Sequence, residues 1–135
     1  MREKINSYKE LDVYNEAYNL ALDIFKLSKG FPSEEKYSLT DQIRRSSRSV
    51  CLNIGEAWRK RRYPKSFISK LSDSETEACE TQISLSFAKD CGYIYSDLFN
   101  LYEDRYDKVL GMLVKMINHP EKWIIPNRNH QDKHS

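Results

Sequence analysis

The sequence predicts an all-α protein, folded as an antiparallel up-down-up-down four-helix bundle. Apolar residues recur at helical spacing in four long segments, and glycine and proline interrupt the pattern between them. The connecting stretches are short, which favours antiparallel neighbours. A chain of 135 residues suits one domain with one continuous core. We therefore assign residues 1–125 to a single four-helix-bundle domain and residues 126–135 to a polar C-terminal tail.

The first helix is predicted between Leu11 and Leu27, before Gly30 and Pro32. Glycine just past a helix and proline beyond it are the expected order at a C-terminus. The apolar arc of this helix is broader than one core seam requires. One edge holds Val13, Ala17, Leu20 and Ile24, and the other holds Leu11, Tyr18, Leu22 and Phe25.

The second helix is predicted to start at a capping box formed by Ser38 and Asp41. It should finish near Arg62, because Pro64 disfavours a helical conformation at Tyr63. Pro64 itself can open the third helix as its first residue. The apolar face expected on the second helix comprises Leu39, Ile43, Ser46, Val50, Ile54 and Ala57.

The third helix is predicted to end at Gly92, and the fourth to run from about Asp97 to Asn118, before Pro120. The seam of the third helix lies close to heptad spacing. It comprises Phe67, Leu71, Ser74, Ala78, Leu85 and Ala88.

Composition argues against several functional classes. No stretch approaches the roughly 18 apolar residues of a membrane span, and no apolar run follows the N-terminus, so a cytoplasmic protein is expected. Three widely spaced cysteines without a C-x-x-C pair indicate buried thiols. The three histidines lie at or beyond the end of the fourth helix, and the glycines form no phosphate-binding loop. Glu77 and Glu80 are best explained as a solvated acidic face. We therefore expect no enzyme activity, no metal and no cofactor.

Charge is distributed unevenly along the chain. The net charge is only +2, yet residues 44–70 hold nine Lys or Arg residues against one acid, Glu56. Arg44, Arg48, Arg59 and Arg62 share one strip of a helical wheel, roughly opposite the apolar face. Such a row can follow a phosphate backbone. The predicted nucleic-acid-binding residues are Arg44, Arg45, Arg48, Arg59, Lys60, Arg61, Arg62 and Lys65, with Trp58 and Tyr63 as possible base-stacking groups.

The same residues can also serve structural roles or bind a protein. Cations at a helix C-terminus are favourable against the helix dipole, and Glu56 can pair with Lys60 four positions on. Trp58 can belong to the edge of the core. The arginines can also meet the acids around Glu75 on a neighbouring subunit or an acidic protein partner.

Apolar residues beyond the core seams predict a surface for self-association. Ile83 and Phe87 are neighbours on the third helix, about 150° from its main seam. Tyr14, Tyr18 and Phe25 lie on the broad arc of the first helix. These five residues are the candidate oligomer interface. The alternative is that the helices splay and bury both faces within one chain.

The segment from Gln42 to Arg61, QIRRSSRSVCLNIGEAWRKR, resembles the hallmark segment of the four-helix-bundle proteins encoded by intervening sequences in bacterial 23S rRNA genes. The segments FISKLSDSE (67–75) and CGYI (91–94) and the ending NHPEKW (118–123) are also similar to that family. The likeness runs from about Ser7 to Ile125. Many relatives have Asn-Ile-Ala-Glu-Gly where this chain has Asn53-Ile54-Gly55-Glu56-Ala57.

This resemblance implies an up-down bundle that assembles as a ring-like homopentamer. It also implies kinship with accessory proteins of diversity-generating retroelements, which bind nucleic acid and a reverse transcriptase through a basic surface. Together with the residues above, it leads us to expect a non-enzymatic, oligomeric RNA-binding protein. The alternative is a protein-interaction scaffold that docks a reverse transcriptase or another acidic partner.

Overall fold

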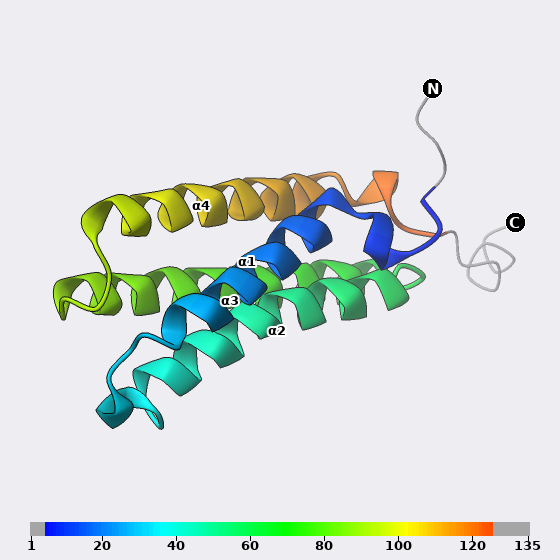
Figure 1. Cartoon of the computed structure of the whole chain (residues 1–135). Helices are drawn as coiled ribbons and strands as arrows, with labels where there is room; N and C mark the ends of the chain where they lie inside the picture. Colours follow the sequence, from blue (N-terminus) through cyan, green and yellow to red (C-terminus); the bar gives the residue numbers. More distant parts are fainter. Residues whose placement is uncertain (1–4, 126–135) are drawn as a thin grey trace, which may run out of the picture.

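The computed structural model of the chain describes residues 5–125, and these residues form an all-α fold (Figure 1). The long helices are α1 (Asp12–Ser28), α2 (Leu39–Arg59), α3 (Pro64–Asp90) and α4 (Ser96–Asn118). Three short 3-10 helices accompany them: η1 (Tyr8–Glu10), η2 (Ser33–Glu35) and η3 (Pro120–Lys122). The fold class predicted from the sequence is confirmed. The polar tail predicted at residues 126–135 lies outside the described residues.

The helices pack in chain order, as an up-down bundle requires. Within the described residues α2 packs on α1 and on α3, α4 packs on α3, and α1 and α4 close the bundle. The pairs α1 and α3, and α2 and α4, have no Cα atoms within 8 Å of each other there. They therefore occupy diagonal corners. None of the helices in this part of the chain is both long enough and apolar enough to cross a lipid bilayer.

The capping box predicted at Ser38 and Asp41 is wrong, because Glu35 performs the capping from η2. Its Oε1 accepts the Leu39 backbone N–H at 3.3 Å and the Ser38 hydroxyl at 2.6 Å. The Tyr93 hydroxyl donates to Glu35 Oε2 at 2.8 Å. Hydrogen bonds from Ser38 and Tyr93 hold the pKa of Glu35 below its ordinary value. The start of α2 is thus fixed partly from the far end of α3.

The end predicted for the second helix is also wrong by three residues. Helix α2 stops at Arg59, and Lys60 leaves helical geometry to open a tight turn in which the Tyr63 N–H reaches Lys60 O at 2.9 Å. Pro64 is the first residue of α3, as predicted. Gly92 follows the end of α3 with a φ of 81°, a left-handed conformation that glycine adopts without strain.

The core is a continuous apolar cluster drawn from all four long helices. A short polar seam crosses it between α2 and α3. Ser74 donates to Val50 O at 2.8 Å, and Thr81 donates to Ser46 Oγ at the same distance. Hydrogen bonds between buried helices fix their register, since a slipped pairing would leave these hydroxyls unsatisfied. The largest fully buried side chains are Tyr106, Phe67, Leu11, Leu20, Ile24, Ile43, Ile54, Leu71, Leu85, Leu113, Val50 and Val109.

One end of the bundle gathers the α2–α3 turn, η1 and η3 (Figure 1). The Ile125 N–H donates to Arg61 O at 2.9 Å, so the segment after α4 returns to this turn. Both η1 and η3 therefore pack near the α2–α3 turn, which is the most cationic stretch of the sequence. The expectation of three buried thiols is only partly met: Cys51 is buried, whereas Cys79 and Cys91 are exposed.

Candidate nucleic-acid interface and neighbouring surfaces

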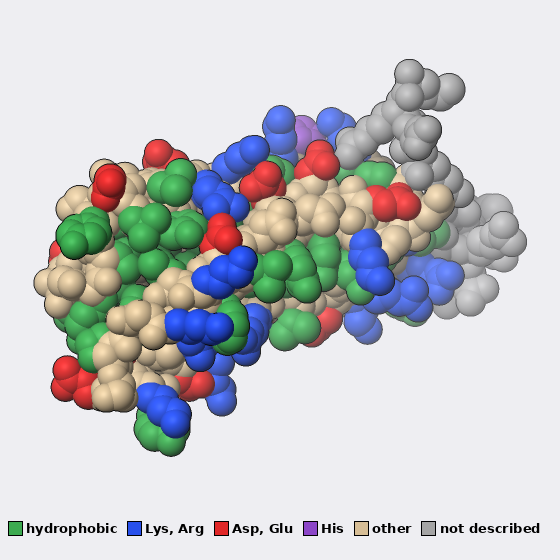
Figure 2. Space-filling model, viewed as in Figure 1, with side chains coloured by type: hydrophobic (Ala, Val, Ile, Leu, Met, Phe, Trp, Pro, Cys, Tyr) green, Lys and Arg blue, Asp and Glu red, His purple; other side chains and the backbone are tan. Residues whose placement is uncertain are grey.

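Four exposed cations flank the α2–α3 turn, and we call them the basic turn cluster. They are Arg59, Lys60, Arg62 and Lys65. Among the described residues none of the four forms an ion pair with a carboxylate. Figure 2 shows Lys and Arg side chains gathered over this end of the bundle. Unpaired cations held this close repel one another, and a bound anion would relieve that repulsion.

Glu56 is the nearest candidate to neutralise the cluster, and it is engaged elsewhere. Its Oε2 lies 2.9 Å from Lys70 Nζ on α3 instead of pairing with Lys60. Lys60 Nζ lies 6.0 Å from the centre of the Tyr63 ring, which is 54% exposed. Tyr63 thus remains accessible beside the cations, as the stacking prediction requires.

Trp58 and Arg61 depart from their predicted roles. Trp58 is only 6% exposed, so its ring is not open to stack on a base. The Arg61 guanidinium lies 3.4 Å from the ring centroid, and its Nε donates to Trp58 O at 2.8 Å. Burial and the neighbouring charges of Arg59 and Arg62 lower the pKa of Arg61. Arg61 therefore covers the core edge while it contributes charge to the turn.

The row of arginines expected along α2 does not form one outward ridge, because α1 packs against part of that strip. Arg44 is half-buried, donates to Ser28 Oγ at 2.7 Å and lies 4.7 Å from the Phe25 ring centroid. Arg48 is exposed and lies 5.7 Å from the same ring. Arg45 points to the other side and pairs with Asp41 at 3.1 Å. These three arginines are separated from the basic turn cluster.

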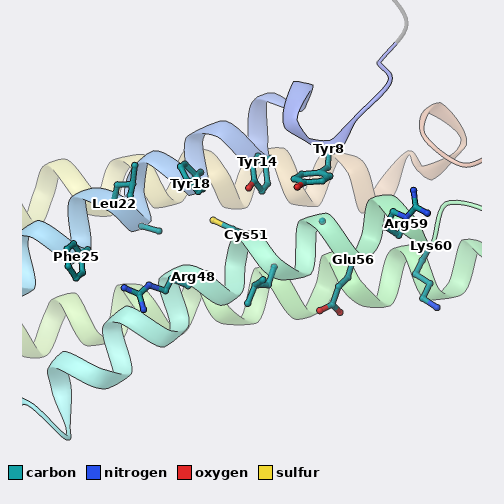
Figure 3. Close-up of a pocket in the computed structure, with 13 residues that line it drawn as sticks. Tyr8, Tyr14, Tyr18, Leu22, Phe25, Arg48, Cys51, Glu56, Arg59 and Lys60 are labelled. Carbon is teal, nitrogen blue, oxygen red and sulfur yellow. The ribbon is translucent and has the colours of Figure 1, made fainter.

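An apolar groove of about 1030 Å³ runs between α1 and α2 (Figure 3), and we call it the α1–α2 groove. Tyr8, Tyr14 and Tyr18 form a row of rings with centroid separations of 4.9 and 5.9 Å. Arg48 lies toward the Phe25 end, and Arg59 and Lys60 lie at the Tyr8 end, beside Glu56. The full lining is Tyr8, Tyr14, Tyr18, Ala21, Leu22, Phe25, Arg48, Cys51, Leu52, Gly55, Glu56, Arg59 and Lys60.

The groove floor is chemically inert. Burial raises the pKa of the Cys51 thiol to about 11, so the thiol stays protonated and weakly nucleophilic at neutral pH. Burial also raises the pKa of the Tyr14 hydroxyl. Within the described residues no group of His, Cys, Asp and Glu side chains is arranged to hold a metal ion. The groove is therefore a surface for contact, built from aromatic and aliphatic side chains.

The outer face of α3 carries the other two predicted interface residues. Ile83 is 52% exposed and Phe87 is 60% exposed. Glu77 and Glu80 lie on the same side, in a cleft between α2 and α3 that Ile83 also lines. Burial raises the pKa of Glu77, and the adjacent Glu80 adds to the effect. The two carboxylates are thus close neighbours, as the sequence spacing indicated.

Sequence reasoning missed two residues of the groove. Leu52 is 64% exposed and Tyr8 lies in η1, ahead of the first predicted helix. Leu52 could have been predicted, because it is an apolar residue on the polar side of the second helix. Tyr8 could not have been placed without knowing that η1 contacts α2.

Comparisons with known proteins agree with this fold. The family model described as 23S rRNA-intervening sequence protein matches residues 9–115. A solved structure from Bacteroides thetaiotaomicron, a protein of unknown function from the S23 ribosomal protein family, superposes with a TM-score of 0.72 at 27% sequence identity. The match covers 78% of this chain and 95% of that one. None of the curated proteins compared with the chain matches it.

Proposed function

The chain belongs to the 23S rRNA-intervening sequence protein family, and from this premise we propose that it is a non-enzymatic, self-associating RNA-binding protein of the bacterial cytoplasm. The basic turn cluster supports the proposal most directly. Four exposed cations lie around one turn, and no described carboxylate neutralises them. Phosphate oxygens are the natural partners of such a group, because guanidinium and ammonium groups displace counterions from a polyanion.

Tyr63 gives the cluster a means to prefer unpaired nucleotides. Its ring is exposed beside Lys60, and stacking on an aromatic ring is worth about 1–3 kcal/mol per base. Duplex RNA offers no accessible base face. We therefore expect single-stranded RNA to bind more tightly than a duplex of the same length.

A matched pair of variants tests the proposal. Arg62→Gln with Lys65→Gln removes two charges from the cluster, and Lys36→Gln with Lys108→Gln removes two charges elsewhere. Fluorescence anisotropy with a labelled single-stranded RNA should show about 25-fold weaker binding for the first pair, since each lost phosphate contact costs about 0.7 log units of affinity, or roughly 1 kcal/mol, near 0.1 M salt. The second pair should bind as the unmodified protein does. Equal binding by all three proteins would refute RNA recognition at this turn.

A second candidate function is that of a scaffold for another protein, such as a reverse transcriptase or an acidic partner. The α1–α2 groove supports it, because an apolar trough with cations toward both ends suits an amphipathic acidic helix. If this function is the right one, reversing the charges of Arg59 and Arg61 should abolish capture of the partner and leave any RNA retention unchanged. Loss of RNA binding without loss of the partner would favour the first function.

A further inference from the structure

The outer face of α3 bears a stripe of exposed residues at spacings of three and four, which we call the α3 ridge. It comprises Asp73, Thr76, Glu80, Ile83, Phe87 and Asp90, and every member is exposed. Residues at this spacing fall on one line along a helix. The ridge is apolar at Ile83 and Phe87 and acidic on both sides of them. Asp73 and Asp90 have only weak local partners, at 3.8 Å and 3.7 Å, and Glu80 lies beside another acid, Glu77.

The α1–α2 groove has the complementary pattern. Its apolar centre includes Tyr18 and Leu52, which are 47% and 64% exposed, so a single chain leaves them open to water. An added Cβ on Gly55 would meet nothing within 4 Å, so the wall of the groove is free at that point. Arg48 and Arg59 flank this apolar stretch on α2.

The charges on the two surfaces are also spaced alike. At a rise of about 1.5 Å per residue, Arg48 and Arg59 lie about 16 Å apart along α2, and Glu80 and Asp90 lie about 15 Å apart along α3. Both acids could thus meet a cation while Ile83 and Phe87 enter the apolar stretch. Such a contact removes exposed apolar surface at about 25 cal/mol per Å².

One chain cannot make this contact with itself. Helices α1 and α3 occupy diagonal corners, and the groove and the ridge lie on different sides of the bundle. We propose that the α3 ridge of one copy docks in the α1–α2 groove of the next copy. The two surfaces differ, so the contact is heterologous, and its repetition closes a ring or extends a filament. This inference rests on the self-association included in the proposed function and defines which faces meet.

Complementation between two damaged copies tests the pairing. Phe87→Glu places a charge on the ridge, Leu52→Glu places one in the groove, and Leu101→Glu is a control at another exposed leucine, on α4. Light scattering after size exclusion should give a mass of at least twice 16.0 kDa for the unmodified protein and the control. Each interface variant alone should run as a monomer, and circular dichroism should show its helices intact.

A mixture of the two interface variants carries one undamaged groove and one undamaged ridge, so it should form a heterodimer of about twice 16.0 kDa. A monomeric unmodified protein would overturn the proposal, and so would a mixture that stays monomeric. Persistence of the oligomer in Phe87→Glu alone would overturn docking through the α3 ridge. RNA binding is read separately: monomeric Leu52→Glu should still bind a short RNA, whereas Arg62→Gln with Lys65→Gln should bind it more weakly and remain assembled.

Discussion

Arg61 and Arg62 are adjacent residues of equal charge, and the structure gives them different roles. Arg61 lies over Trp58, with its guanidinium carbon 3.4 Å from the ring centroid and its Nε donating to Trp58 O at 2.8 Å. Arg62 is exposed at the same turn. Replacing each in turn by glutamine therefore separates the structural contribution from the electrostatic one.

The expected magnitude follows from the contacts that Arg61→Gln removes. A cation–π contact of this kind contributes about 0.5–2 kcal/mol, and the hydrogen bond contributes about 0.5–1.5 kcal/mol. We expect the free energy of unfolding to fall by about 1–3 kcal/mol, a melting-temperature decrease of roughly 3–10 °C for a chain of this size. Arg62→Gln should change stability by no more than about 0.5 kcal/mol.

Thermal unfolding followed by circular dichroism measures the stability of both variants. Fluorescence anisotropy with RNA should rank the two variants in the opposite order. At a temperature where both are folded, Arg62→Gln should weaken RNA binding more than Arg61→Gln does. Equal stability of the two variants would refute the structural role of Arg61 over Trp58.

Three further predictions concern the scaffold. The pKa of Glu35 is lower in the folded state, so its carboxylate stabilises the protein at pH values above the unfolded-state pKa, and this stabilisation is lost as the pH falls through 4.5 and below. The difference in melting temperature between Glu35→Gln and the unmodified protein should therefore disappear on acidification. A difference that does not change with pH would contradict this. Gly111 lies inside α4 with open space at its Cβ position, so Gly111→Ala should raise the free energy of unfolding by about 0.5–1 kcal/mol. Gly92 has a φ of 81°, so Gly92→Ala should lower the free energy of unfolding by about 1–2 kcal/mol. Denaturant titrations measure both changes, and the reverse order would contradict the geometry. The Tyr106 hydroxyl is buried beside Thr81 but makes no hydrogen bond of good geometry with any described residue. Tyr106→Phe should therefore unfold at equal or higher denaturant concentration, and a loss of stability above about 1 kcal/mol would show that the contact with Thr81 is a hydrogen bond.

Local chemistry made most of the fold predictable. Pro64 and Gly92 mark the two ends of α3 because each residue restricts or frees its own backbone, whatever surrounds it. The start of α2 at Ser38 was predicted correctly, but its capping partner was not, because the cap comes from Glu35 with support from Tyr93, which is 58 positions from Glu35 in sequence. No local pattern encodes such a contact.

The candidate site was less predictable than the fold. A helical wheel placed Arg44 and Arg59 on one strip, but only the packing of α1 over that strip decides which arginines stay free. The burial of Trp58 likewise depends on the Arg61 side chain, which folds back over it. Composition located the cationic segment, and tertiary structure divided it into a free cluster and arginines engaged with the bundle.

The salt dependence of RNA binding tests the central claim most directly. If three or four cations of the basic turn cluster contact phosphates, the logarithm of the association constant for single-stranded RNA should fall against the logarithm of salt concentration with a slope of about −2 to −3 for each engaged copy. A series of anisotropy titrations between about 50 and 200 mM salt gives that slope. A slope near zero, or no binding at the lowest salt, would contradict recognition of a polyanion by this turn.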